Sequence, residues 1–353
     1  MNVPTTMRAW RLHQYGAPID VLRLESVAVP TPDAGELLVQ VEAFTLNFND
    51  LERIGGGNMM VVPAFPYSPG MEVTGRVVAV GDPSDPRIGA RVVGTTKGAH
   101  GGYADFAICL GSGSFAIPDD IALPDAAALF FPYHLAWLGL YDRADLQPGQ
   151  TVLIHAGAGG SGSAAIQLAK HRGARVIATA GGPHKVEVCR SIGADLAIDY
   201  LASDFADAVL AATDGVGVDI VFDNVGESVF ESSLKCTRYN GQYLMMGFAS
   251  NKVVADEPFV VPRRLALGNL KLGGVLLAYA DEAMAGFLKS AMGWNFAPAA
   301  LGQRITDEIV SLYRAGVVRP RIGAEVGFAD APQAITAMRD RATIGRIVAR
   351  TDQ

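Results

Sequence analysis

Residues 151–170 read TVLIHAGAGGSGSAAIQLAK, and this stretch determines the fold that we expect. It begins as a mainly apolar strand and ends with the apolar spacing of a helix. Between the two, Gly157, Gly159 and Gly162 form the pattern G-x-G-x-x-G. A lone match to this pattern is weak, but a match that follows a strand and opens a helix is typical of a dinucleotide-binding βαβ unit.

Each glycine of this turn has its own physical reason. Gly157 permits the tight turn, Gly159 lets a pyrophosphate approach the backbone, and Gly162 lets the helix pack closely on the strand. The N–H groups at the start of the helix then face the phosphates. The alternative is a glycine-rich turn that binds nothing. The predicted cofactor contacts here are Ala156, Gly157, Ala158, Gly159, Gly160, Ser161 and Gly162.

The next strand ends without the acid that an NAD-binding protein would carry. Residues 178–185 read ATAGGPHK, and the first charged residue among them is Lys185. An acid at the strand end would bind the ribose hydroxyls of NAD and repel the 2′-phosphate of NADP. Lys185 can pair with this phosphate, and Tyr200, after the third strand, can donate a hydrogen bond to it. The sequence therefore favours NADP(H), although Lys185 alone is equally consistent with a solvated helix residue.

The two parts of the chain have different patterns. From Thr151 onward, apolar β-branched runs alternate with helices, which indicates an α/β fold with a parallel sheet covered on both faces. Residues 1–127 instead read as short strands between turns, which predicts a compact β-barrel or sandwich. Residues 125–144 have helical periodicity, and the chain closes with a strand-like stretch at 345–350.

Composition limits the class of protein. The length of 353 residues suggests two domains, and half of the residues are hydrophobic. The net charge of −7 argues against nucleic acid or an anionic membrane as a partner. We see no signal peptide and no apolar stretch long enough to span a bilayer. The odd cysteine count, three, fits no disulfide framework, which favours a reducing compartment. Taken together, these features lead us to expect a cytoplasmic enzyme that binds small molecules.

The sequence predicts no metal site. Zinc needs three or four Cys, His, Asp or Glu side chains brought together. The chain has no C-x-x-C pair, and its six histidines form no H-x-x-x-H pair. His155 lies inside a predicted buried strand, so we expect a packed core residue there.

Further motifs resemble the zinc-independent quinone oxidoreductase branch of the medium-chain dehydrogenase/reductase superfamily. Residues 29–43, VPTPDAGELLVQVEA, are similar to its opening motif P-x-P-G-x-G-E-V-L-V. Residues 45–55, TLNFNDLERIG, are similar to its L-N-x-x-D segment. In residues 68–81, SPGMEVTGRVVAVG, Met71 stands where zinc-dependent relatives carry a histidine. The resemblance covers nearly the whole chain.

The resemblance implies a GroES-like β-barrel domain over residues 1–127 and a Rossmann doubly wound parallel-sheet domain over residues 128–278. A C-terminal segment, residues 279–353, is expected to return to the first domain. The family also implies NADP(H) as cofactor and usually a homodimer, paired through edge strands near LGGVLLAY, residues 272–279. The implied reaction is hydride transfer, without metal, to a quinone or to the β-carbon of an α,β-unsaturated carbonyl.

The family motifs also imply particular site residues. Lys185 and Tyr200 match contacts to the NADPH phosphate, and Arg341 in DRATIGR matches an arginine that reaches the same phosphate. The remaining predicted cofactor contacts are Thr179, Asn224, Gly247 and Phe248.

Asn47 is the candidate catalytic residue that would orient a substrate carbonyl, because a neutral amide donates a hydrogen bond without bringing charge. A structural cap is the alternative role for Asn47. We expect Asp50 to cap the following helix. Glu52 and Tyr67 are predicted to line the substrate pocket.

Two other functions remain open. An NADP-linked alcohol dehydrogenase without zinc is disfavoured, because no obvious residue would take the alcohol proton. The other is an NADPH-binding structural or regulatory protein with little turnover. Steady NADPH consumption with a panel of quinones or alkenals separates an enzyme from such a protein.

Overall fold

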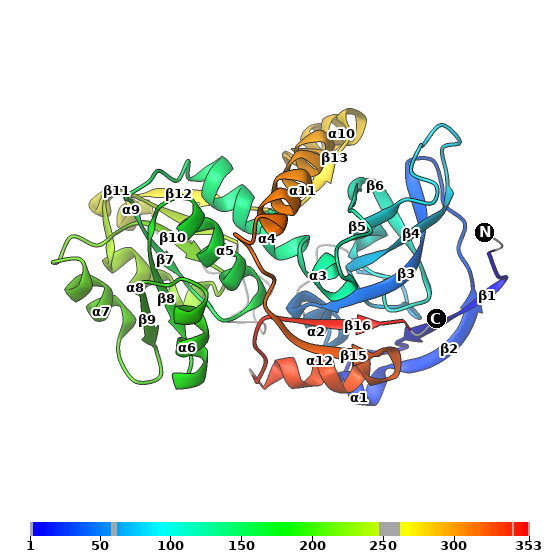
Figure 1. Cartoon of the computed structure of the whole chain (residues 1–353), viewed down its shortest axis with the longest axis horizontal. Helices are drawn as coiled ribbons and strands as arrows, with labels where there is room; N and C mark the ends of the chain where they lie inside the picture. The colour runs from blue at the N-terminus through cyan, green and yellow to red at the C-terminus, as the bar shows by residue number, and fades with distance from the viewer. Residues whose placement is uncertain (1–2, 58–61, 247–261, 341, 352–353) are drawn as a thin grey trace. The chain divides into compact units, whose positions relative to one another are not determined.

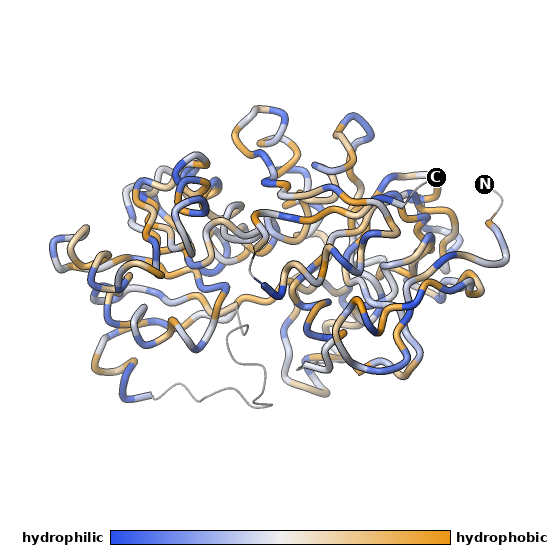
Figure 2. Tube along the Cα trace, turned by 90° about the horizontal axis from the view of Figure 1, so that it is seen from below, coloured by the Kyte–Doolittle hydropathy of each residue, from blue (hydrophilic) through white to orange (hydrophobic). Residues whose placement is uncertain are grey.

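The computed structural model describes residues 3–57, 62–246, 262–340 and 342–351. The chain forms two compact units, which we describe separately (Figure 1). The first unit comprises Met1–Phe130, Ala278–Ser311 and Ile322–Gln353, and the second comprises Phe131–Leu277 and Leu312–Arg321. Apolar stretches alternate with hydrophilic ones along the chain of each unit (Figure 2).

Four antiparallel strands close into a barrel in the first unit. These are β3 (Glu36–Leu46), β4 (Glu72–Val80), β5 (Arg91–Thr96) and β6 (Phe106–Ala116). Each strand pairs with the next, and β6 pairs back with β3, where Leu38 lies opposite Ile108. The unit is therefore a barrel, one of the two forms that the strand spacing allowed.

The C-terminal strand joins the same sheet. Strand β16 (Arg346–Arg350) runs antiparallel to β3, and β15 (Ile322–Gly327) runs parallel to β16. The strand expected at 345–350 is confirmed. The other elements of this unit are β1 (Thr6–Arg11), α1 (Pro18–Val21), β2 (Arg23–Ala28), α2 (Phe48–Ile54), η1 (Lys97–Ala99), α3 (Leu123–Ala128), β13 (Tyr279–Ala280), α10 (Glu282–Met292), β14 (Ala297–Pro298), most of α11 (Ala299–Arg314), η3 (Phe328–Asp330) and α12 (Ala331–Arg339). The last residues of α11, from Leu312, belong to the second unit.

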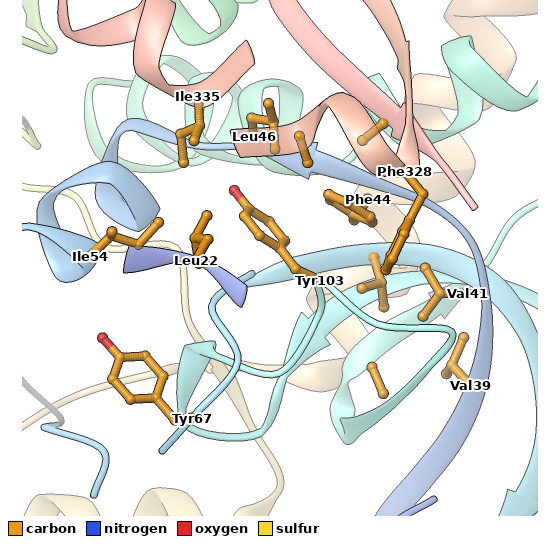
Figure 3. Packing of buried hydrophobic residues seen from close by; sticks show 14 of the residues in the cluster. Leu22, Val39, Val41, Phe44, Leu46, Ile54, Tyr67, Tyr103, Phe328 and Ile335 are labelled. Carbon is orange, nitrogen blue, oxygen red and sulfur yellow. The ribbon is translucent and has the colours of Figure 1, made fainter. Parts of the chain in front are cut away.

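Aromatic side chains occupy the core of the first unit. The ring of Tyr103 is fully buried and stacks on Phe44, with ring centroids 4.5 Å apart. Phe328 packs edge-on against Phe44 at 5.9 Å. Figure 3 shows Tyr103 among Leu22, Phe44 and their apolar neighbours. Because this core draws on β3, β6 and η3, it ties the C-terminal residues to the barrel.

The second unit is built on a six-stranded sheet in the order β12-β11-β10-β7-β8-β9, and all of its pairings are parallel. The strands are β7 (Thr151–Ile154), β8 (Arg175–Ala180), β9 (Leu196–Asp199), β10 (Val218–Asp223), β11 (Thr237–Met245) and β12 (Lys271–Gly274). The helices are α4 (Phe131–Trp137), the π-helix η2 (Leu138–Arg143), α5 (Gly160–His171), α6 (Pro183–Ser191), α7 (Phe205–Ala212), α8 (Glu227–Lys235) and α9 (Pro262–Gly268). This is the parallel sheet that the alternation of strands and helices predicts.

Helices cover both faces of this sheet (Figure 1). On one face, Leu153, Ile177 and Val221 share a buried cluster with residues of α7 and α8. Their strand neighbours, such as Val152 and Val176, are also fully buried, because α5 packs on β7 and β8. The strands therefore read as continuous apolar runs.

Two expected elements differ from the structure. The helix expected over residues 125–144 is broken between α3 and α4, and Pro132 lies in the first turn of α4, where a missing N–H is tolerated. The apolar stretch 272–279 is not one long strand: β12 ends at Gly274, and Tyr279 belongs to the short β13 of the first unit. Within the described residues, no helix combines the length and apolar character needed to cross a bilayer.

Candidate active site

The glycine turn lies between β7 and α5, as expected, but the structural reasons for its individual residues differ from those expected. Ala156, not Gly157, takes the left-handed conformation, with φ of 52°. Gly157 is required by packing instead, because a Cβ there would lie 2.9 Å from both the Ala178 Cβ and the Cys189 Sγ. A Cβ on Gly162 would lie 2.2 Å from the Ala156 carbonyl oxygen, so the start of α5 packs closely on the turn that follows β7.

Gly159 is the N-cap of α5. A Cβ on Gly159 would meet only the Ala156 carbonyl oxygen, at 3.3 Å. The first turn of a helix leaves N–H groups outside its own hydrogen-bond ladder. Such a turn, with no side chain before it, is suited to bind a phosphate.

Thr179 is 2% exposed and does not present its hydroxyl to solvent. Its Oγ1 lies 2.9 Å from Nδ1 of His155, and Nε2 of the same ring lies 2.8 Å from Oγ of Ser233. Burial lowers the pKa of His155 to about 3, so the ring is neutral at physiological pH. The polar bridge ties β7 and β8 to α8. The Thr179 hydroxyl is thus bonded inside the protein, and the cofactor contact expected at Thr179 stays a prediction.

The end of β8 opens onto a turn made by Gly181 and Gly182. Gly182 has φ of +89° and caps α6, on which Lys185 is half-buried near the N-terminus. Tyr200 follows β9 directly and is 40% exposed. A Cβ on Gly181 would lie 2.6 Å from the Tyr200 hydroxyl oxygen. The turn therefore gathers Tyr200 and the start of α6 at one edge of the sheet.

The other predicted cofactor residues are less defined. Asn224 follows β10, and its Nδ2 donates to the carbonyl of His155 at 3.4 Å. Gly247, Phe248 and Arg341 lie outside the described residues.

Asp223, the last residue of β10, is a functional candidate that the sequence analysis missed. Its carboxylate accepts the N–H of Val225 at 2.7 Å, the N–H of Gly226 at 3.0 Å, and the hydroxyl of Tyr243. Burial raises the pKa of Asp223 to about 6. An acid at the end of an apolar strand was the available signal. Asp223 fixes the turn that carries Asn224.

In the first unit, Asn47 begins α2 through a capping box with Asp50. The N–H of Asn47 donates to Asp50 Oδ2 at 3.2 Å, and the Tyr103 hydroxyl donates to the same oxygen at 3.2 Å. Burial raises the pKa of Asp50 to about 6, against the opposing charge of Arg53. The capping role expected of Asp50 is confirmed.

The amide of Asn47 belongs to a buried polar network. Its Oδ1 accepts from Arg346 at 2.8 Å, and its Nδ2 donates to the Thr45 carbonyl at 3.2 Å. Arg346 also pairs with Glu72, and the Thr45 hydroxyl donates to that carboxylate at 2.5 Å. Asn47 is 4% exposed. This placement gives Asn47 a structural role and leaves little of its amide for a substrate.

The two predicted pocket residues occupy different environments. Tyr67 is buried, and its hydroxyl donates to the Arg53 carbonyl at 3.2 Å. Burial raises the pKa of Tyr67 to about 12, so it is a poor proton donor near neutrality. Glu52 is half-buried on α2. His100 contacts the Tyr67 ring, and burial, then Arg53, lowers its pKa.

The residues at the position of a catalytic zinc do not fit that metal. Met71 is buried, and its sulfur accepts from Asn49 Nδ2 at 3.8 Å. The adjacent Glu72 is paired with Arg346. In the part of the chain that the structure describes, no three or more His, Cys, Asp or Glu side chains form a group that could hold a metal.

Comparisons with known proteins give the family. Residues 33–119 match the model of the alcohol dehydrogenase GroES-like domain, and residues 160–291 match the model described as zinc-binding dehydrogenase. A quinone oxidoreductase of Pseudomonas aeruginosa is 31% identical over 336 residues, 95% of this chain and 96% of the relative. A quinone oxidoreductase-like protein 2 homolog of Nematostella vectensis is 29% identical over 356 residues, 99% and 91% of the two chains.

A solved structure is similar over the same length. Mycobacterial Rv1454c, determined in complex with NADPH, matches with a TM-score of 0.82 and 29% identity, over 98% of this chain and 99% of that one. The barrel unit and the parallel-sheet unit thus define an oxidoreductase of the medium-chain dehydrogenase/reductase superfamily. Within it, this chain belongs to the zinc-independent, quinone oxidoreductase-like branch.

Proposed function

We propose that this protein is an NADPH-dependent reductase of quinones or α,β-unsaturated carbonyl compounds. The observation that carries the proposal is the glycine turn before α5 beside a β8 end that has no acid. The neutral Gly181 and Gly182 leave room for a 2′-phosphate, and no carboxylate from β8 repels it. The relatives named above support the same assignment, since one is described as complexed with NADPH and another as a quinone oxidoreductase.

Most of the proposed nucleotide contacts belong to the second unit, and Arg341 belongs to the first. The first turn of α5 offers N–H groups to the pyrophosphate. Lys185, Tyr200 and Arg341 are proposed to hold the 2′-phosphate, with Asn224, Gly247 and Phe248 as further contacts. When bound, NADPH supplies a hydride from C4 of its nicotinamide.

The substrate would be held by the first unit, with Glu52 and Tyr67 near it. Hydride transfer needs a positioned acceptor, and the proton that completes the reduction can come from solvent. Asn47 is proposed to act through its contacts with Arg346 and Asp50, as a positioning residue. We also propose a homodimer through β12, the edge strand of the parallel sheet, which light scattering would test.

Lys185→Ala tests the cofactor assignment. A charge-assisted contact contributes roughly 1.5–3 kcal/mol, so the NADPH dissociation constant should rise about tenfold to a hundredfold. The NADH constant should stay nearly unchanged, because NADH has no phosphate for Lys185. Arg190→Ala, which removes an exposed cation of the same helix, is the matched control and should change neither constant.

Fluorescence titration with both nucleotides measures these constants. Equal weakening of NADPH and NADH in Lys185→Ala would contradict the assignment. Turnover is tested separately, by NADPH oxidation with a panel of quinones, enones and aldehydes. Tight NADPH binding without oxidation on any acceptor would favour a binding protein over a reductase.

A further inference from the structure

Asp199 joins the turns that follow two neighbouring strands. It is the last residue of β9, in register with Ala180, the last residue of β8. Its Oδ1 accepts the N–H of Gly182 at 2.9 Å and the N–H of Leu201 at 3.0 Å. One carboxylate oxygen therefore bridges the turn after β8 and the turn after β9.

This bridge holds two features of the proposed phosphate site. Gly182 is in the left-handed region, with φ of +89°, and starts α6. Tyr200 lies between Asp199 and Leu201, so its backbone is fixed from both sides, and its own N–H donates to the Ala180 carbonyl at 3.2 Å. The Tyr200 hydroxyl lies beside Gly181, 2.6 Å from the position that a Cβ at residue 181 would take.

Asp199 is also an acid close to the place where the adjacent strand lacks one. A free carboxylate there would repel a 2′-phosphate and attract ribose hydroxyls. Two N–H donors on one oxygen offset part of its charge and direct that oxygen to the backbone. The geometry therefore supports a role in shaping the turn.

We propose that Asp199 is a positioning residue for cofactor selectivity. It fixes the Gly181–Gly182 turn and the Tyr200 hydroxyl in the arrangement that accepts the 2′-phosphate of NADPH. This inference rests on the proposed function, because it takes NADPH as the cofactor.

The test compares Asp199→Ala, Asp199→Asn and wild type by fluorescence titration with NADPH and NADH. Asp199→Ala releases both N–H groups, so the NADPH dissociation constant should rise about tenfold while the NADH constant changes less than about twofold. Asp199→Asn keeps an acceptor oxygen and should restore most of the NADPH preference.

Asp204→Ala is the matched control. Asp204 caps α7 by accepting the N–H groups of Ala206 at 2.8 Å and Asp207 at 3.1 Å, so it has the same kind of bonds a few residues along the chain. Its removal should lower stability and leave the ratio of the two dissociation constants at the wild-type value.

Several outcomes would overturn the inference. An unchanged ratio in Asp199→Ala, or equal weakening of both nucleotides, would show that Asp199 has only a structural role. Tighter NADPH binding by Asp199→Asn would show that its charge repels the phosphate. A wild-type ratio near one would overturn the cofactor assignment together with this inference, whereas a wild-type preference that persists in Asp199→Ala overturns this inference alone.

Discussion

Each unit buries one aspartate against a tyrosine, and the two pairs differ in how the carboxylate is bonded. Asp50 pairs with Tyr103 in the barrel unit, and Asp223 pairs with Tyr243 in the parallel-sheet unit. Both aspartates are fully buried, and burial raises the pKa of each to about 6.

The two carboxylates differ in which of their oxygens accept hydrogen bonds. Both oxygens of Asp223 accept bonds from donors that need an acceptor, the N–H of Val225 and Gly226 and the hydroxyl of Tyr243. At Asp50 all the bonds converge on Oδ2, and Oδ1 is buried without a partner among the described residues. Similar pKa shifts thus arise at a carboxylate with both oxygens bonded and at one with a single bonded oxygen, and we expect only the first to be required by the fold.

The largest expected effect is on the pH dependence of stability. Both folded pKa values, about 6, lie above the unfolded value of 3.8, so the folded state binds more protons between these limits. The free energy of unfolding should therefore fall as pH rises from about 4 to 6, by roughly 1.4 kcal/mol per pH unit for each acid, or about 3 kcal/mol each in all.

Urea unfolding at a series of pH values measures this slope. Asp50→Asn should remove the contribution of one acid, about half of what Asp50 and Asp223 contribute together. A slope that is the same in Asp50→Asn and wild type would mean that Asp50 does not titrate in this range.

The second prediction uses the same substitution at both sites, at pH 7. Asp50→Asn keeps an acceptor for the Asn47 N–H and removes a buried charge, so the free energy of unfolding should rise by about 1 kcal/mol. Asp223→Asn places an amide NH2 against groups that are themselves donors, so the free energy of unfolding of this variant should fall by about 2 kcal/mol. If the free energy of unfolding changes with the same sign in both variants, the expected difference between Asp50 and Asp223 is wrong.

The smallest expected effect concerns the residue that donates to Asp50. Asn47→Ser keeps a capping oxygen at the start of α2 but loses the amide contact with Arg346, so stability should fall by about 1 kcal/mol. If Asn47 acts only by positioning, kcat should stay within a few-fold of wild type. A loss of about a hundredfold in kcat with unchanged stability would instead indicate direct contact with the substrate.

Local patterns predicted much of the fold. The glycine turn, the strand that ends without an acid and the closing strand at 345–350 each depend on residues that are neighbours in sequence, and the structure contains all three. The break between α3 and α4 has a local signal in Pro132, which the apolar periodicity around it concealed.

The polar partners in the site depend on distant residues. Arg346 lies 274 positions from Glu72, and Ser233 lies 78 positions from His155, so no spacing in the sequence predicts either pair. The partner of the Thr179 hydroxyl is likewise distant in the sequence, since it is the ring of His155, which follows β7. Asp199 ends the short strand β9, and no pattern in the sequence indicates its bond to the backbone of the turn after β8.

The contact between Gly181 and Tyr200 bears on how such a protein changes its cofactor during evolution. A single base change converts a glycine codon into one for aspartate or glutamate, and Gly181 is not among the residues with positive φ, so its backbone can accept either acid. A side chain at 181 would add a carboxylate and also displace the Tyr200 hydroxyl, which lies 2.6 Å from the new Cβ. If Tyr200 binds the 2′-phosphate as proposed, Gly181→Asp would remove that ligand and add a carboxylate for the ribose hydroxyls, and dissociation constants for Gly181→Asp that favour NADPH would refute this. Gly182, at φ of +89°, offers no such route. Of the two adjacent glycines, we therefore expect residue 181 to be the one at which an acid would reverse the proposed preference for NADPH.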